Sequence, residues 1–211
     1  MEFSLIETMR WEPGNGLLRG DRHLDRMERS ARELGFSFDH ATIRGAITRS
    51  TRGTIPLRVR AELYQSGKVS VAATPFYPVE SGKGWRLRIA DTRLFSGNPM
   101  LRHKTSLRQP YVAARREVDV SQADEVILLN ERDEVCEGTI TNVFLRDRSD
   151  GVLLTPSLSS GLVEGILRAE LIAMHKAVEE TVPVDRLLAA REIYVGNSLR
   201  GLIPAKFAPR D

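Results

Sequence analysis

Apolar residues in the first quarter of the chain recur at the spacing of amphipathic helices. Between residues 22 and 35 they stand three or four positions apart, at Leu24, Met27, Ala31 and Leu34. Gly35 follows the last of them, and glycine is common at helix ends. Residues 41–51 show a shorter version of the same pattern. We therefore expect two helices, over residues 22–35 and 41–51.

Alternation of apolar and polar residues then predicts strands. Residues 57–64 alternate strictly, as in a strand with one buried face. The polar turn at 65–68 leads into a partner strand at 69–73, and residues 85–89 alternate again. We expect these three strands to form one antiparallel sheet that carries both helices.

The second half of the chain has longer apolar runs. Residues 126–129 are continuously apolar, which is typical of a strand buried on both faces. We also expect helices at 108–118 and from about residue 165, and further strands at 135–145, 152–155 and 192–195. The change of pattern coincides with the Ser-Gly-Asn-Pro stretch at 96–99, so we predict two domains, 1–98 and 99–211.

Composition narrows the class of protein. The chain has 211 residues, 41% of them hydrophobic and 28% charged, as expected for a globular protein with an ample core. No stretch approaches the roughly 20 apolar residues of a membrane span, and the first residues lack the apolar core of a secretory signal. Cys136 is the single cysteine, so no internal disulfide forms, and we expect a cytoplasmic protein.

Charge and motif searches exclude several functions. The isoelectric point is about 9.2, but the net charge is only +3 and basic residues alternate with acidic ones, which does not favour nucleic acid binding. The four histidines lack metal-ligand spacing, and no glycine fingerprint for a nucleotide is present. Cys136 has no histidine partner and is expected to be a packed core residue.

Lys104 is the candidate for covalent chemistry. Only five lysines occur beside 26 arginines, and this one follows the 96–99 stretch and precedes an expected helix. An amine can lose its proton in a protein, whereas a guanidinium cannot. A desolvated lysine can form a Schiff base with a carbonyl, which is the chemistry of pyridoxal phosphate enzymes. Taken alone, Lys104 is better interpreted as a solvated surface lysine, because lysine is rarely buried.

Glu137 is the candidate carboxylate. It lies within the expected strand at 135–145, where burial of a charge is costly unless the charge is paired. One interpretation is a solvated residue at a strand edge. The other is a carboxylate that faces a pyridinium nitrogen and keeps the ring protonated, so that the ring can accept electrons.

Three segments offer donors to a phosphate group. The backbone amides of Ile166 and Leu167, at the start of the helix expected after Gly165, would form an anion site. Gly165 would let the backbone come close to a ligand. Asn197 and Ser198, with Arg26 on the first helix, add amide, hydroxyl and guanidinium donors. Each segment alone also fits an ordinary helix start, turn or surface arginine.

In their order along the chain, these segments resemble the class IV aminotransferase family, the fold-type IV pyridoxal phosphate enzymes. The resemblance covers residues 6–10, 23–26, 103–105, 137–142, 155–168 and 197–201. It implies an α/β (α+β) fold of two domains, an N-terminal α/β sandwich over 1–98 and a C-terminal pseudo-barrel over 99–211. It also implies pyridoxal 5'-phosphate as cofactor and a homodimer.

The resemblance assigns roles to the candidate residues. Lys104 would be the Schiff-base lysine and proton-transfer group, and Glu137 would pair with the pyridine nitrogen. The phosphate would be held by Arg26, the backbone amides of Ile166 and Leu167, and Asn197 with Ser198. Arg60 would bind a substrate carboxylate. Two departures stand out: many relatives have a longer N-terminal strand, and Leu167 replaces a threonine hydroxyl that is common in relatives.

The family contains several activities. The segments at 5–10 and 197–201 look most like 4-amino-4-deoxychorismate lyase, which releases pyruvate to give 4-aminobenzoate for folate synthesis. An aminotransferase acting on D-amino or branched-chain acids would use the same Lys104 with a second, keto-acid substrate. A protein that binds the cofactor without turnover is the third hypothesis. In each case the partner is a small-molecule amine, and fold alone does not decide among them.

Overall fold

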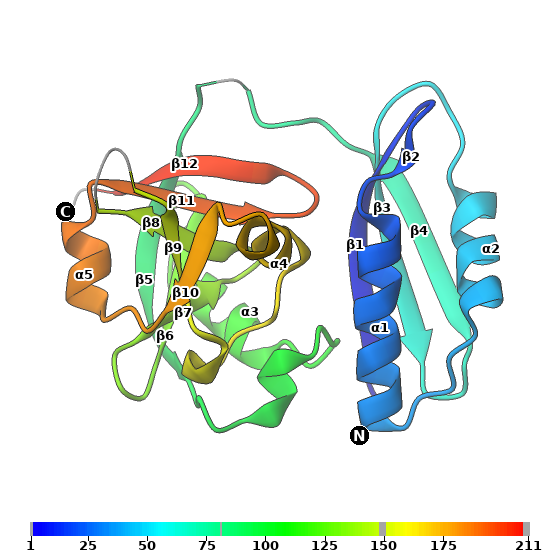
Figure 1. The fold of residues 1–211 in the computed structure, drawn as a ribbon, viewed down its shortest axis with the longest axis horizontal. Helices are drawn as coiled ribbons and strands as arrows, with labels where there is room; N and C mark the ends of the chain where they lie inside the picture. The colour runs from blue at the N-terminus through cyan, green and yellow to red at the C-terminus, as the bar shows by residue number, and fades with distance from the viewer. Residues whose placement is uncertain (1, 81, 148–150, 209–211) are drawn as a thin grey trace. The chain divides into compact units, whose positions relative to one another are not determined.

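The structure is a computed structural model that describes residues 2–80, 82–147 and 151–208 (Figure 1). Contacts divide the chain into two compact units. The first contains Met1–Pro78 and His103–Leu107, and the second contains Val79–Arg102 and Arg108–Asp211. No helix among the described residues is both long and apolar enough to span a membrane.

The first unit is an antiparallel sheet with two helices on one face. The strands lie in the order β2-β1-β3-β4. The elements are β1 (Ser4–Glu12), β2 (Gly16–Leu17), α1 (Gly20–Leu34), α2 (His40–Ser50), β3 (Leu57–Tyr64) and β4 (Val69–Pro75). Both predicted helices and the predicted hairpin of β3 and β4 are confirmed.

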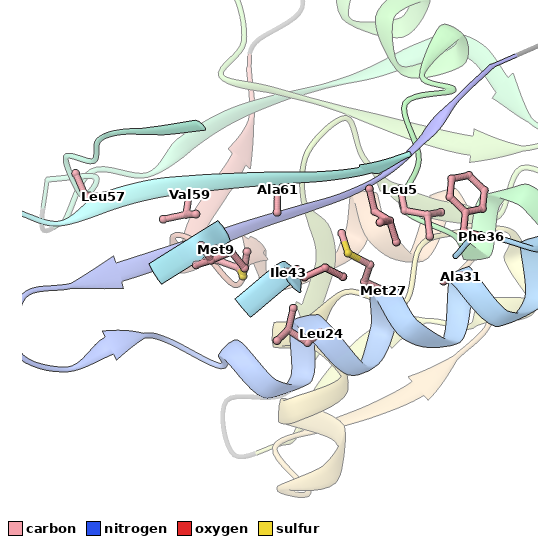
Figure 2. Packing of buried hydrophobic residues seen from close by; sticks show 12 residues of the cluster. Leu5, Met9, Leu24, Met27, Ala31, Phe36, Ile43, Leu57, Val59 and Ala61 are labelled. Carbon is pink, nitrogen blue, oxygen red and sulfur yellow. The ribbon is translucent and has the colours of Figure 1, made fainter. Parts of the chain in front are cut away.

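The core of this unit lies between the sheet and its helices (Figure 2). Every second residue of β3 points to it, and α1 and α2 cover it with Leu24, Met27 and Ile43. Burying a side chain of this size contributes about 1.5–3 kcal/mol. The alternation in β3 and the helical spacing in α1 therefore both result from burial in the same apolar layer.

The sequence pattern does not predict β1, although eight of its residues pair with β3. The strand is largely buried, but Ser4 and Glu7 are buried together with Leu5 and Met9. A polar residue on the buried face breaks the alternation by which a strand is recognised. Glu7 is buried together with its hydrogen-bonding partners His23 and Arg26.

The second unit is built around a ring of strands. One sheet has the order β10-β9-β8-β11-β12-β5-β6-β7, and β7 also pairs with β8, which closes a barrel of six strands. The strands are β5 (Trp85–Leu94), β6 (Glu125–Asn130), β7 (Val135–Gly138), β8 (Asn142–Arg146), β9 (Leu153–Pro156), β10 (Ala177–Glu180), β11 (Glu192–Asn197) and β12 (Gly201–Phe207). The helices are α3 (Gln109–Arg116), α4 (Ile166–Ala173) and α5 (Val184–Ala189), with 3-10 turns at Pro99–Arg102 and Leu158–Ser160. A sandwich unit and a barrel unit are the expected fold class.

Two sequence predictions are corrected here. The strand predicted at 85–89 does not join the antiparallel sheet of the first unit: β5 is longer and pairs in parallel with β6 and β12. Alternation shows that one face of a strand is buried, but not which sheet buries it. The strand predicted at 135–145 is two strands, β7 and β8, joined by a turn at residues 139–141.

The observed units also differ from the predicted division at residue 98. Residues 79–98 belong with the second unit because β5 lies in the barrel. Residues 103–107 return to the first unit, because they pair with β1. The chain therefore passes between the units three times.

Candidate active site

Lys104 lies in the first unit, where β1 fixes its backbone. The Lys104 carbonyl accepts a hydrogen bond from the Ile6 amide at 2.8 Å, and the Ser106 amide donates to the Ser4 carbonyl at 2.9 Å. Thr105 forms an antiparallel bridge with Leu5. The candidate lysine is therefore carried on a short extended segment at the edge of a sheet.

His103 ties the same segment to α1. Its Nδ1 lies 3.0 Å from the Ser30 hydroxyl, and its Nε2 lies 3.5 Å from a Glu33 carboxylate oxygen. Because one neighbour of Lys104 contacts the helix and the next contacts the strand, both sides of the segment are anchored within one unit.

Arg26 lies in a buried charged cluster that the sequence analysis missed. Its Nε donates to Glu7 Oε1 at 2.8 Å and its Nη2 to Glu7 Oε2 at 2.6 Å, a bidentate pair. His23 Nδ1 is 2.6 Å from the same carboxylate. Burial alone would raise the pKa of Glu7, but Arg26 and His23 lower it to about 2. His23 and Arg26 of α1 are thus buried against the Glu7 carboxylate of β1.

Arg60 lies on the face of the sheet opposite the helices. Its Nε donates to Glu62 Oε1 at 2.7 Å, and Ser4 donates a longer hydrogen bond to the other oxygen of Glu62. Arg60 is half-buried. The predicted carboxylate-binding residue therefore has a carboxylate partner on its own strand.

Glu137 lies in the second unit, buried on β7 with 5% of its surface exposed. Its Oε1 accepts hydrogen bonds from the Tyr111 hydroxyl at 2.7 Å and the Val163 amide at 3.2 Å. Its Oε2 accepts one from Asn142 Nδ2 at 3.4 Å. The interpretation of Glu137 as a solvated strand-edge residue is wrong, since the carboxylate is buried among three donors.

Tyr111 is a site residue that the sequence analysis did not find. Burial raises the pKa of the Tyr111 hydroxyl, and the neighbouring charge of Glu137 raises it further. The hydroxyl therefore remains protonated and acts as a donor. Its place on an ordinary amphipathic helix, α3, gave no sequence signal of this role.

A second buried carboxylate, Glu125, shapes the turn after Glu137. It accepts hydrogen bonds from the amide and hydroxyl of Thr139, the Ile140 amide and the Thr141 hydroxyl, at 2.6–3.1 Å. A Cβ on Gly138 would lie 2.4 Å from the Thr141 hydroxyl, so only glycine fits there. The turn is thus fixed from inside the barrel.

Position 165, the N-cap of α4, requires glycine because a neighbouring side chain lies against it. A Cβ at this position would lie 1.7 Å from Asn142 Oδ1. Asn142 also donates to the Val163 carbonyl at 3.1 Å as well as to Glu137. Asn142 therefore joins the start of α4 to the carboxylate, and the close approach of a ligand to Gly165 stays a prediction.

The first amides of α4, at Ile166 and Leu167, receive no side-chain cap from the described residues. Uncapped amides at a helix N-terminus favour an anion. The side chain of Leu167 packs into an apolar cluster with Phe144 and Leu171, so this position offers a backbone amide and no hydroxyl.

The turn after β11 has an internal organiser in Asn197. Its Oδ1 accepts from the amides of Leu199 and Arg200 at 3.1 and 2.9 Å, and its Nδ2 donates to the Ile140 carbonyl at 3.0 Å. The polar atoms of Asn197 therefore hold the turn that carries the buried Ser198.

Close packing joins this turn to α4. A Cβ on Gly196 would lie 3.0 Å from a methyl group of Leu167. The second unit thus brings Glu137, the start of α4 and the 197–198 turn into one connected set. Lys104, Arg26 and Arg60 belong to the first unit.

Comparison with known proteins shows the family of this chain. The model of the amino-transferase class IV family matches residues 4–207. The chain belongs to the class IV aminotransferase family. It is therefore a pyridoxal phosphate-dependent enzyme, a lyase or an aminotransferase, as the resemblance implied.

Relatives of this class IV enzyme carry both names. A protein of Schizosaccharomyces pombe provisionally named aminodeoxychorismate lyase is 30% identical, over 94% of this chain and 87% of its own length. A protein of Thermotoga maritima provisionally named branched-chain-amino-acid aminotransferase is 31% identical, over 88% of this chain and 70% of its own length.

A solved structure shares the fold of this class IV enzyme along nearly its whole length. It is a crystal structure from Mesorhizobium loti provisionally named amino-acid aminotransferase, with 51% identity and a TM-score of 0.95. It covers 98% of this chain, and this chain covers all of it. The expected sandwich and pseudo-barrel fold is confirmed.

The donor set of this class IV enzyme fits pyridoxal phosphate. A buried carboxylate suits a protonated ring nitrogen, and uncapped helix amides beside a serine suit a phosphate. Both features belong to the second unit and are joined by Asn142 and Gly196. The residues of this chain are thus chemically suited to the cofactor of their family.

Proposed function

We propose that this enzyme is a 4-amino-4-deoxychorismate lyase, which removes pyruvate from its substrate to leave 4-aminobenzoate. The observation that carries the choice is the yeast relative, which matches nearly the whole of both chains and is provisionally named for this activity. The chemistry of the site supports removal of a proton from an amine-bearing carbon, the step with which this elimination begins.

Lys104 is proposed as the residue that holds the cofactor through Nζ and then, once released, takes the proton from the substrate carbon. A base must be held within reach of that proton, and the two-sided anchoring by β1 and α1 restricts where the Lys104 backbone can move. When bound, pyridoxal phosphate supplies the electron sink that makes such a carbon acidic.

Glu137 is proposed to hold the proton on the ring nitrogen. Its three donors favour the ionised carboxylate, which is the form that pairs with a protonated ring. Removal of this carboxylate is expected to reduce the ring's capacity to accept electrons.

Phosphate binding is assigned to two groups of residues. In the second unit these are the amides of Ile166 and Leu167, with Ser198 positioned by the Asn197 turn. In the first unit Arg26 is the proposed donor, oriented by its bidentate pair with Glu7. Arg60 remains the proposed partner of a substrate carboxylate.

The test supplies aminodeoxychorismate as the sole substrate to the purified enzyme. Pyruvate should be released without an added keto acid, and the Lys104→Ala variant should lose at least 1,000-fold in kcat because anchor and base are removed together. Borohydride should fix the cofactor to the wild type and not to the variant. Pyruvate release by Lys104→Ala at the wild-type rate would contradict the role of this lysine.

An aminotransferase is the second candidate, favoured by the 51% identical structure and by the Thermotoga maritima relative. The same assay distinguishes it. Product that forms only when an amino acid and a keto acid are supplied together would replace the lyase proposal. Absence of turnover with either substrate set would return the hypothesis of a binding protein.

Homodimerisation and a cytoplasmic location also remain proposals, carried over from the family resemblance and the single cysteine. Sedimentation equilibrium at micromolar concentration should give twice the mass of the chain, which is 23.7 kDa.

A further inference from the structure

We propose that Tyr111 is a positioning residue that acts through Glu137, keeping this carboxylate ionised and the cofactor's ring nitrogen protonated. This inference rests on the proposed pairing of Glu137 with that nitrogen.

Hydrogen bonding and packing orient the Tyr111 side chain towards Glu137. Its hydroxyl lies 2.7 Å from Glu137 Oε1, the shortest of the three hydrogen bonds described for this carboxylate. The side chain is 6% exposed and packs in an apolar cluster with Leu101 and Val126. Arg108 lies over the ring, with Cζ 4.4 Å from its centroid, and donates to the Thr139 carbonyl. The apolar cluster and Arg108 therefore both contact Tyr111.

Electrostatics makes the hydroxyl a permanent donor. Burial first, and then the charge of Glu137, raise the pKa of Tyr111, so that its proton stays on Oη throughout the working range of an enzyme. A donor of this kind lowers the free energy of a carboxylate more than that of the neutral acid. Hydrogen bonds to charged groups are also the stronger ones.

Glu137 and the ring nitrogen of the cofactor would share one proton. When Glu137 faces the ring nitrogen, the proton lies either on the nitrogen or on the carboxylate. Stabilising the carboxylate shifts this equilibrium towards the protonated ring, which is the form that withdraws electrons. Tyr111 thus strengthens the electron sink without touching the cofactor.

The decisive variant is Tyr111→Phe, which retains the ring and its contact with Arg108 and removes only the hydroxyl. Tyr194→Phe is the matched control, since its hydroxyl donates to Glu192 at 2.8 Å elsewhere in the same unit. The measurement is the nitrogen-15 resonance of ring-labelled pyridoxal phosphate bound to each holoenzyme. Glu137→Gln provides the reference for an unpaired nitrogen.

In Tyr111→Phe the resonance should move from the wild-type position towards that of Glu137→Gln, whereas Tyr194→Phe should leave it unchanged. The kcat should fall about tenfold with little change in KM, the effect of one hydrogen bond to a charge. In the Glu137→Gln background, adding Tyr111→Phe should have no further effect on the resonance.

Two failures can be told apart. If Glu137→Gln moves the resonance and Tyr111→Phe does not, the role of Tyr111 is refuted while that of Glu137 stands. If neither moves it, the proposed pairing of Glu137 itself fails. Should Tyr111→Phe not fold, 3-fluorotyrosine at position 111, a stronger donor, should move the resonance in the opposite direction, and no movement would refute the role.

Discussion

At the scale of single residues, the buried carboxylate of Glu7 is stabilised by the side chains that it contacts. Glu7 is 1% exposed and meets two side chains of α1. Isolated burial of such a carboxylate would cost several kcal/mol. The cluster with Arg26 and His23 offsets this cost and, in doing so, fixes the orientation of the arginine.

Glu7 should make acid stability depend on this cluster. Its pKa is about 2 in the folded protein against an ordinary value of 4.5, so its stabilisation is complete above pH 4.5 and is lost as the pH falls towards 2. Glu7→Gln should reduce the free energy of unfolding in urea by about 3 kcal/mol at pH 7. The difference from wild type should shrink as the pH falls below 4.5. A difference that is constant from pH 7 to pH 3 would contradict the assignment.

Gly165 should be intolerant of even a methyl group. Gly165→Ala places a Cβ on Asn142 Oδ1, so the start of α4 or the Asn142 amide must move. We expect a loss of about 2 kcal/mol or more in stability and weaker cofactor binding, measured by calorimetry.

Gly45→Ala is the matched control within a helix interior. The added Cβ would meet only the flexible end of Arg49, and the change should stabilise the protein by about 0.5–1 kcal/mol. Equal effects of the two alanines would show that the Asn142 contact does not restrict Gly165.

At the scale of elements, the turn between β7 and β8 connects separate parts of the site. Glu125 binds it from within the barrel, and its Ile140 carbonyl receives the Asn197 side chain. A shift of the Glu125 carboxylate would therefore also move the turn that carries Ser198.

Glu125→Gln should test this connection. The new amide group must face donors of Thr139 and Thr141, which should cost about 2–3 kcal/mol in thermal stability. Affinity for free phosphate or for cofactor should fall together with it, because the 197–198 turn loses its support. Thr155→Val is the control: it deletes a buried hydroxyl bonded to the Val143 carbonyl on a neighbouring strand pair. It should lower stability alone, and an unchanged affinity in Glu125→Gln would refute the connection.

Sequence patterns predicted most elements that bury one regular face. α1 and β3 lie where their periodicity placed them, because burial on one side produces that periodicity. β6 lies where its continuous apolar run placed it, because both of its faces are buried. β1 and β12 were missed for physical reasons: β1 buries Glu7 on its apolar face, and β12 contains Pro204. The sheet that receives β5 depends on pairing between distant segments, which periodicity does not encode.

The residues of the candidate site also differ in whether the sequence could predict them. Lys104 and Glu137 were predicted from residue type and from family resemblance. Tyr111, Glu7 and Glu125 were not, because their roles depend on a partner distant in sequence. A buried polar residue inside an apolar segment is the one signal that could have pointed to Glu7.

At the scale of the whole molecule, the chain passes between its two units at residues 78–79, 102–103 and 107–108. The segment with Lys104 therefore belongs by sequence to the middle of the second unit, but by pairing to the sheet of the first. A single break in the connection near residue 78 leaves this segment attached to the C-terminal fragment.

Cleavage at a protease site introduced after Pro78 should therefore give two fragments that co-purify. The pairing of residues 104–106 with β1, together with the His103 contacts to α1, should hold them until urea is added. His103→Ala in the cleaved protein should lower the urea concentration at which the fragments separate. His175→Ala is the control, since this exposed histidine follows α4 in the second unit. Equal midpoints for the two variants would contradict the prediction.

The backbone contact between Ile6 and Lys104 has one more consequence, for how the protein can be observed. The Ile6 amide donates its hydrogen to the Lys104 carbonyl rather than to a strand of its own sheet. Its rate of deuterium exchange therefore reports whether the segment that carries Lys104 is paired with β1, independently of cofactor colour or turnover. One amide near the start of the chain can thus serve as a native, label-free sensor of lysine placement a hundred residues away.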